Sequence, residues 1–217
     1  MKKLLIPYYT DFTQEASPVA CNQYLNGLEK QAIDQVNWNA YPYKPKVQFV
    51  MAHTGDRILL KFFVEEKQIR AQYSHTNDPV YKDSCVEFFI SPQGDPGYFN
   101  FEINCAGVCL GGYGEDRNHR HLLPPTLLDT IERQVFILHK QEEGEPLVYW
   151  EQIIQIPLAV FGLKTIDTFK GMHARGNFYK CGDELDNPHY VSWNPIDTAE
   201  PNFHVPACFG ALEFASA

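Results

Sequence analysis

The most constraining feature of the chain is a strict alternation of apolar and polar side chains between residues 98 and 105. One set of alternate positions holds Phe99, Phe101, Ile103 and Cys105. The other set holds Tyr98, Asn100, Glu102 and Asn104. Successive side chains of a β-strand point to opposite faces, so this segment predicts a strand with one face in the core. The polar face is where we expect ligand contacts.

The same two-residue period recurs through most of the chain after residue 45. Residues 47–51 and 58–64 flank a turn at 53–56 and predict a hairpin. A second hairpin is predicted from residues 135–139 and 147–156. Further strands are expected within three segments, residues 83–91, 171–180 and 208–214.

The remaining segments carry weaker signals. Residues 1–45 are expected to be an irregular segment packed on the domain, with a short helix at 22–32, and 111–125 is expected to be a loop. Many strands and little helix predict an all-β fold, a two-sheet antiparallel β-sandwich of Ig-like or jelly-roll type. With no repeat or linker in the sequence, we expect one domain over residues 1–217.

Charge and length exclude several classes of function. The chain has 217 residues and a net charge of −9, with no basic cluster. An acidic chain repels phosphate backbones, so we expect no nucleic-acid partner. The chain is long enough to bury a core without disulfides or metal, and we expect its six cysteines to be mostly reduced and buried.

The beginning of the sequence bears on localisation. The apolar run in residues 1–7 is too short for a signal peptide, and no stretch of the sequence reaches the 18 apolar residues of a membrane span. As written, the chain is therefore expected to be cytoplasmic and not inserted in a membrane. An export signal ahead of an incomplete N-terminus would make it extracytoplasmic.

Several sequence blocks occur together and in order. They are residues 38–45, 78–90, 98–104 with Gly107, 177–180, Ser192-Trp193, and Phe203-His204-x-Pro206 before Phe209-Gly210. In these blocks the chain resembles the family 9-like carbohydrate-binding modules, within the DOMON-like β-sandwich superfamily. The resemblance implies non-catalytic binding of a mono- or oligosaccharide and association with a polysaccharide-degrading enzyme. It implies no cofactor beyond a structural calcium ion, whose ligands it does not place here.

The resemblance also implies a site. The sugar ring is expected between two aromatic side chains, Tyr81 and Trp193, with Glu87 bonding its hydroxyls. Further polar contacts are expected from the strand and block positions Asn100, Glu102, Asn104, Asn177 and Lys180. Aromatic rings cover the C–H faces of a sugar, and carboxylates and amides suit its equatorial hydroxyls.

The residues themselves leave alternatives open. Trp193 could belong to the core, as we expect for Trp38 and Trp150. A partly buried Glu87 needs partners, and Arg175 or Lys180 could supply them instead of a ligand. The long loop offers three more candidates for one rim of the site, which are Tyr113, Arg117 and Arg120.

Three rival functions also remain open. A glycoside hydrolase, or an accessory domain of one, would use a carboxylate pair such as Glu87 and Glu102, with Asp83 as a further acid. A metal site would use His119 and His121 with more distant histidines and Cys181. A haem- or protein-binding sandwich is the third, although no axial ligand stands out.

Overall fold

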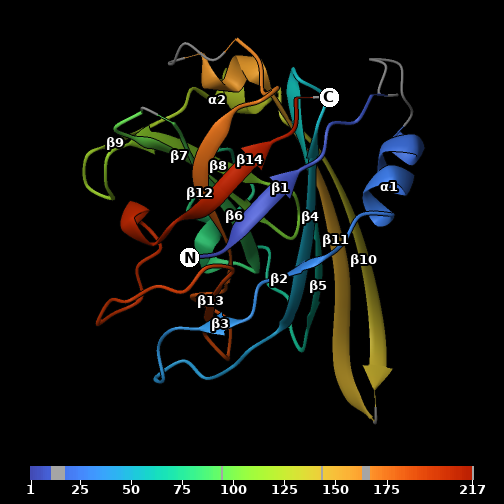
Figure 1. Ribbon diagram of the computed structural model, residues 1–217. Helices are drawn as coiled ribbons and strands as arrows, with labels where there is room; N and C mark the ends of the chain where they lie inside the picture. Colours follow the sequence, from blue (N-terminus) through green and yellow to red (C-terminus); the bar gives the residue numbers. More distant parts are fainter. Residues whose placement is uncertain (11–17, 94, 143, 163–166, 217) are drawn as a thin grey trace.

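The computed structural model describes residues 1–10, 18–93, 95–142, 144–162 and 167–216, and these form a two-sheet β-sandwich. This confirms the predicted fold class. Figure 1 shows the two sheets as separate layers, with the long β10 and β11 strands on one side. Gly94 and Glu143, which fall between predicted strands, lie outside the described residues.

The larger sheet has nine strands among the described residues. Seven run in the order β1 (Lys3–Ile6), β14 (Gly210–Phe214), β12 (His173–Cys181), β6 (Cys85–Pro92), β7 (Tyr98–Asn104), β8 (Cys109–Gly114) and β9 (Arg120–Leu122). Beside them, β13 (Tyr190–Ser192) pairs with β12 and with β3 (Gln35–Val36). The pairing of β1 with β14 is parallel, and the other pairs are antiparallel.

The smaller sheet contains the two predicted hairpins. Within the described residues its five strands run in the order β10 (Glu132–Glu142), β11 (Glu145–Pro157), β5 (Arg57–Glu66), β4 (Lys46–His53) and β2 (Gln31–Ala32). Both hairpins and the strands expected within 83–91, 98–105, 171–180 and 208–214 are confirmed.

Helices play a minor part. The α-helices are α1 (Pro18–Asn26) and α2 (Pro125–Leu128), and the 3-10 turns are η1 (Val80–Lys82), η2 (Leu158–Phe161) and η3 (Pro206–Cys208). Cys21 and Leu25 of α1 pack on the outer face of the smaller sheet. No helix among the described residues has the length and apolar character needed to cross a membrane.

The main core lies between the two sheets. Phe99, Phe101 and Ile103 face it, as the alternation predicts, and Phe49 of β4 stacks on Phe178 of β12 across the layers. Trp150 is fully buried in the same core. The prediction that Trp150 is a core residue is therefore confirmed, and so is that for Trp38, which is buried in a second cluster.

That second cluster covers the other face of the larger sheet. Phe89, Tyr98 and Tyr179 alternate with the inter-sheet residues and pack under the chain around Phe203 and Phe209. As a result β6, β7 and β12 are buried on both faces, and a polar residue on their outer face lies in a covered space.

Three local predictions are wrong. The helix runs from Pro18 to Asn26 instead of 22–32, because residues 31–32 pair with β4. The segment 111–125 is not a loop, since it contains the end of β8 and all of β9. The glycines of β8 interrupt the apolar and polar alternation, so the sequence pattern did not reveal this hairpin. Gly114 is needed there because a Cβ atom would lie 2.2 Å from the His119 carbonyl oxygen. The segment 1–45 is likewise less irregular than expected, since its described residues form three strands and a helix.

Candidate functional site

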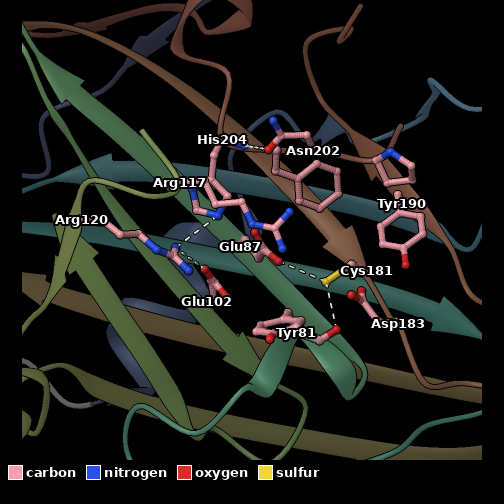
Figure 2. Close-up of a pocket in the computed structure, with 12 residues that line it drawn as sticks. Tyr81, Glu87, Glu102, Arg117, Arg120, Cys181, Asp183, Tyr190, Asn202 and His204 are labelled. Carbon is pink, nitrogen blue, oxygen red and sulfur yellow. Dashed lines mark hydrogen bonds and ion pairs between the residues drawn. The ribbon is translucent and has the colours of Figure 1, made fainter. Parts of the chain in front are cut away.

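A pocket opens on the outer face of the larger sheet, and we call it the acidic pocket. It holds about 520 Å³ of space, part of it open solvent. The lining residues are Tyr81, Glu87, Glu102, Arg117, Arg120, Cys181, Asp183, Tyr190, Pro201, Asn202, Phe203 and His204 (Figure 2). Strands β6, β7 and β12 form its floor, and loops far apart in the sequence form its walls.

Two carboxylates lie side by side on the floor. Glu87 of β6 and Glu102 of β7 are direct partners in the antiparallel ladder, and only 3% and 2% of each residue is exposed. Burial raises the pKa of Glu87 well above its usual range, and the neighbouring Glu102 raises it further. Burial also raises the pKa of Glu102, against the opposing effect of Arg120. The pair therefore holds its protons at a higher pH than ordinary glutamates.

Arg120 links one of these carboxylates to the far wall. Its Nη1 atom lies 3.3 Å from Oε1 of Glu102 and 3.2 Å from Nε2 of His204. Burial and the nearby Arg120 and Arg117 lower the pKa of His204 to about 3, so its imidazole is neutral. Because arginine only donates, Nε2 accepts and the other ring nitrogen, Nδ1, carries the proton, 2.7 Å from the Tyr98 hydroxyl.

Thiols border the other carboxylate. Sγ of Cys181 donates to Oε1 of Glu87 at 3.1 Å, and Cys181 sits directly opposite Cys85 in the β12–β6 ladder. Burial raises the pKa of the Cys181 thiol well above its usual range, which keeps the proton on sulfur for this bond. Cys85, Glu87 and Cys181 offer ligand atoms within 4.8 Å of one another. This is one ligand short of the four that a structural zinc site uses.

The rim of the pocket carries both aromatic and acidic side chains. Tyr81 lies on η1, and its carbonyl accepts from the backbone amide of Asp183 at 3.2 Å. Burial raises the pKa of Asp183 to about 7, and the negative charge of Glu102 adds to the effect. Figure 2 shows Tyr81 and Tyr190 at different edges of the group, with Asp183 between them. Tyr190 packs edge-on against Trp38 and Tyr41, which fixes its ring.

The structure brings three of the eight predicted site residues into the pocket, Tyr81, Glu87 and Glu102. A fourth, Asn100, supports them from beneath, because its Nδ2 donates to Oε1 of Glu102 at 3.1 Å. The sequence left open which of Asn100, Glu102 and Asn104 contacts the ligand. Of the three only Glu102 lines the pocket, so the predicted contacts of Asn100 and Asn104 are wrong, since both are fully buried and outside the lining.

The side chains of Asn104 and Asn177 form hydrogen bonds within the protein instead of contacting ligand. Asn104 donates to Asp83 and accepts from the amides of Ala106 and Val108, which shapes the turn after β7. Asn177 accepts from the amide of Asn194 at 2.8 Å and donates to its carbonyl at 3.0 Å. Both side chains are satisfied inside the protein, and neither lines the acidic pocket.

Lys180 points away from the pocket into the sandwich. Its ammonium lies 2.9 Å from Glu66 of the smaller sheet and 2.7 Å from His189. It therefore does not satisfy Glu87, and Arg175 does not do so either, because its guanidinium bonds the carbonyls of Ala207 and Phe209.

The placement of Trp193 corrects the predicted aromatic clamp. Its indole is 1% exposed and meets Phe49 and Phe178 edge-on in the main core. The residue that lines the pocket from the same stretch of chain is Tyr190, three positions earlier. An interior indole cannot cover a sugar face, so the prediction for Trp193 is wrong.

Several pocket residues were missed or only raised as rim candidates. Arg117 and Arg120 line the pocket, whereas the third rim candidate, Tyr113, bonds Asp95 elsewhere. On β9, Arg120 points inward while the neighbouring His121 is exposed, and His119 pairs with Asp116 on the surface. Among the described residues, no group of three metal-ligating side chains includes His119 or His121, so nothing supports the rival metal site there. Phe203 and His204 were visible as a sequence block, but nothing in that block indicated contact with Glu102 through Arg120.

Comparisons with known proteins give a consistent picture. A family model described as carbohydrate-binding family 9 matches residues 19–214. A crystal structure of a candidate carbohydrate-binding protein from Bacteroides uniformis ATCC 8492 is 40% identical, with a TM-score of 0.87 over 98% of this chain and 99% of that one. No curated protein matches the chain.

Two more distant structures share the fold. Both are family 9 carbohydrate-binding modules from Caldicellulosiruptor kristjanssonii, one in complex with glucose and one with cellotriose. The glucose complex is 11% identical with a TM-score of 0.56, covering 100% of this chain and 97% of that one. The cellotriose complex is 12% identical with a TM-score of 0.60, covering 100% and 95%.

Proposed function

This chain belongs to carbohydrate-binding family 9, and from that premise we propose that the acidic pocket binds a mono- or oligosaccharide without cleaving it. The observation that carries the proposal is the side-by-side pair of Glu87 and Glu102 on the pocket floor, with Arg120 beside them. Carboxylate oxygens accept from sugar hydroxyls and a guanidinium donates to them, so this floor complements a polyol.

Aromatic side chains at two edges supply the apolar part of the site. Tyr81 and Tyr190 both line the pocket and are only partly buried, so their rings keep accessible area for a ligand. In this proposal each covers part of one C–H face of the sugar ring. Tyr190 takes the place that the sequence assigned to Trp193.

The floor favours binding over hydrolysis. Glycoside hydrolysis needs two carboxyl groups that flank the scissile bond. The pair raised from the sequence, Glu87 and Glu102, projects from neighbouring strands on the same side of the ligand space and does not flank a bond in this way. We therefore propose no turnover, and an aryl glycoside incubated with the protein should release no phenol. Release that disappears in Glu87→Gln would support the hydrolase instead.

Isothermal titration with glucose and cellotriose tests the proposal. Net gains of about 1 kcal/mol per hydrogen bond and modest stacking predict dissociation constants of about 10 µM to 0.2 mM. Tyr81→Ala and Tyr190→Ala should each weaken binding about tenfold. Tyr149→Ala, on the smaller sheet and outside the pocket, is the matched control and should bind as the wild type does. Unchanged affinity in both pocket variants would place the site elsewhere.

The family resemblance also bears on a partner. We propose that the chain acts beside a polysaccharide-degrading enzyme and holds its sugar product or substrate. Co-purification of such an enzyme with the protein from the native host would support this, and recovery of the protein without any such enzyme would count against it.

A further inference from the structure

The charges that line the acidic pocket do not balance one another. Its carboxylates are Glu87, Glu102 and Asp183, and its guanidiniums are Arg117 and Arg120. The neutral His204 adds no positive charge. Arg120 is already bonded to Glu102, and Arg117 is an exposed residue at the rim.

Glu87 is the carboxylate left without a cation. It is 97% buried, and among the described residues its side chain makes no ion pair. The donor that it does have is the Cys181 thiol at 3.1 Å, and a thiol is a weak donor. Lys180 of the neighbouring strand β12 points to the other face of the sheet and forms an ion pair with Glu66.

A buried carboxylate in this position needs a stronger partner than a thiol donor to compensate its charge. An unpaired buried charge is costly, and a like charge directly opposite in the ladder adds repulsion. Protonation removes the charge and so avoids this cost, as the raised pKa values of Glu87 and Asp183 indicate. Neutral hydroxyls would relieve this cost in part, but a positive charge carried by the ligand would relieve it directly.

We propose that the acidic pocket selects a sugar that carries a protonated amino group, a hexosamine, whose ammonium lies between Glu87 and Asp183. This rests on the proposed carbohydrate binding. An ammonium has three donors, which suit one oxygen of each carboxylate and one further acceptor. Arg120 and Asn202 then remain to bond the neutral hydroxyls on the other side of the ring.

Titration with four sugars separates this inference from the proposed function. Glucose, glucosamine, N-acetylglucosamine and glucuronate differ in charge on one ring framework. We expect glucosamine to bind about tenfold more tightly than glucose, and glucuronate more weakly than glucose. Acetylation removes the charge and should remove the advantage. If glucose and glucosamine bind equally, or if acetylation changes nothing, the amino-sugar inference is wrong and carbohydrate binding stands. If no sugar binds, the proposed function itself fails.

Two variants locate the effect. Glu87→Gln keeps the shape of the side chain and should reduce the ratio of glucosamine to glucose affinity to about one, whatever its affinity for glucose. Glu213→Gln, on the exposed side of β14, is the matched control and should keep the wild-type ratio. A wild-type ratio in Glu87→Gln would overturn the assignment of the ammonium to this residue.

Proton release provides a second measurement that does not depend on any variant. An ammonium that binds beside Glu87 and Asp183 lowers their pKa values, so the complex should release protons near pH 6 to 7, within the range to which the pKa of Asp183 is raised. Titrations in buffers of different ionisation enthalpy measure this release. Glucosamine binding with no proton release, or with uptake, would contradict the inference.

Discussion

Lys180 and Glu66 form a fully buried ion pair that joins the two sheets of the sandwich, with 2.9 Å between Nζ and Oε2. Trp150 donates to the other oxygen of Glu66 at 2.8 Å, and His189 bonds the same lysine. The network lies on the far side of β12 from the acidic pocket. Lys180 is therefore a structural residue, although its place in the sequence block suggested a ligand contact.

Removing one partner of this pair should destabilise the protein strongly. Lys180→Met leaves the Glu66 carboxylate buried and unpaired, which costs about 3–5 kcal/mol of unfolding free energy. Denaturant unfolding measures the loss. The double variant Lys180→Met with Glu66→Gln removes both charges and should recover much of it, and a double variant no more stable than the single one would contradict this account.

Trp193 should affect stability and not ligand affinity. Its indole fills the core between Phe49 and Phe178, so Trp193→Ala should lower the unfolding free energy by about 3–5 kcal/mol. The milder Trp193→Phe should stay folded and bind sugar within about twofold of the wild type. Denaturant unfolding and titration of the same samples check both parts. If the Trp193→Phe variant is folded but binds sugar tenfold more weakly, Trp193 contributes to the binding site and this account is wrong.

Asp183 should make stability depend on pH in a defined direction. Its pKa is raised to about 7 in the folded state from 3.8, so between these values the folded protein binds more protons than the unfolded chain. Stability from this group is therefore full below about pH 4 and is lost as pH rises to about 7. The pKa values of His189 and His204, lowered to about 3, act in the opposite direction.

A comparison of the wild type with Asp183→Asn isolates the effect of Asp183 on stability. Asp183→Asn cannot ionise, so its stability relative to the wild type should increase as pH rises from 4 to 7 and then level off. Thermal or urea unfolding at intervals across that range measures the difference. A constant difference would mean that Asp183 titrates as it does in the unfolded chain.

Cys208 should be the one fast-reacting thiol in the native protein. It is partly exposed on η3, whereas the other five cysteines are buried. Thiol reagents need access to sulfur, so native protein should titrate about one equivalent quickly and the rest only on unfolding. Cys208→Ser should abolish the fast phase. A fast phase that persists and is slowed by sugar would instead indicate Cys181.

Much of the fold could be predicted from alternation, because the core between the sheets selects every second residue. The site could be predicted only in part. Alternation shows that Asn100, Glu102 and Asn104 share a face, but it does not show that loops from residues 190–209 later cover that face. Polar residues that look exposed in sequence are therefore buried. Which of them reach the pocket depends on contacts between distant segments, such as Arg120 with His204, 84 residues apart.

The same reason explains the exchange of Trp193 for Tyr190. Trp193 was assigned by its position in the Ser192-Trp193 block of the resemblance, and no block contains Tyr190. Geometry decides otherwise, because the backbone amide of Trp193 bonds the carbonyl of Phe178 and directs the side chain into the core.

The parallel pairing of β1 with β14 has a consequence for the order of folding. Residues 3–6 pair with residues 211–214, so β1 cannot complete its pairing until β14 has been synthesised. Residues 173–176 of β12 also wait for β14, because β13 pairs with residues 179–181 at the other end of that strand. In the nascent chain this domain should therefore stay sensitive to proteases until β14 has emerged from the ribosome, and become resistant after that.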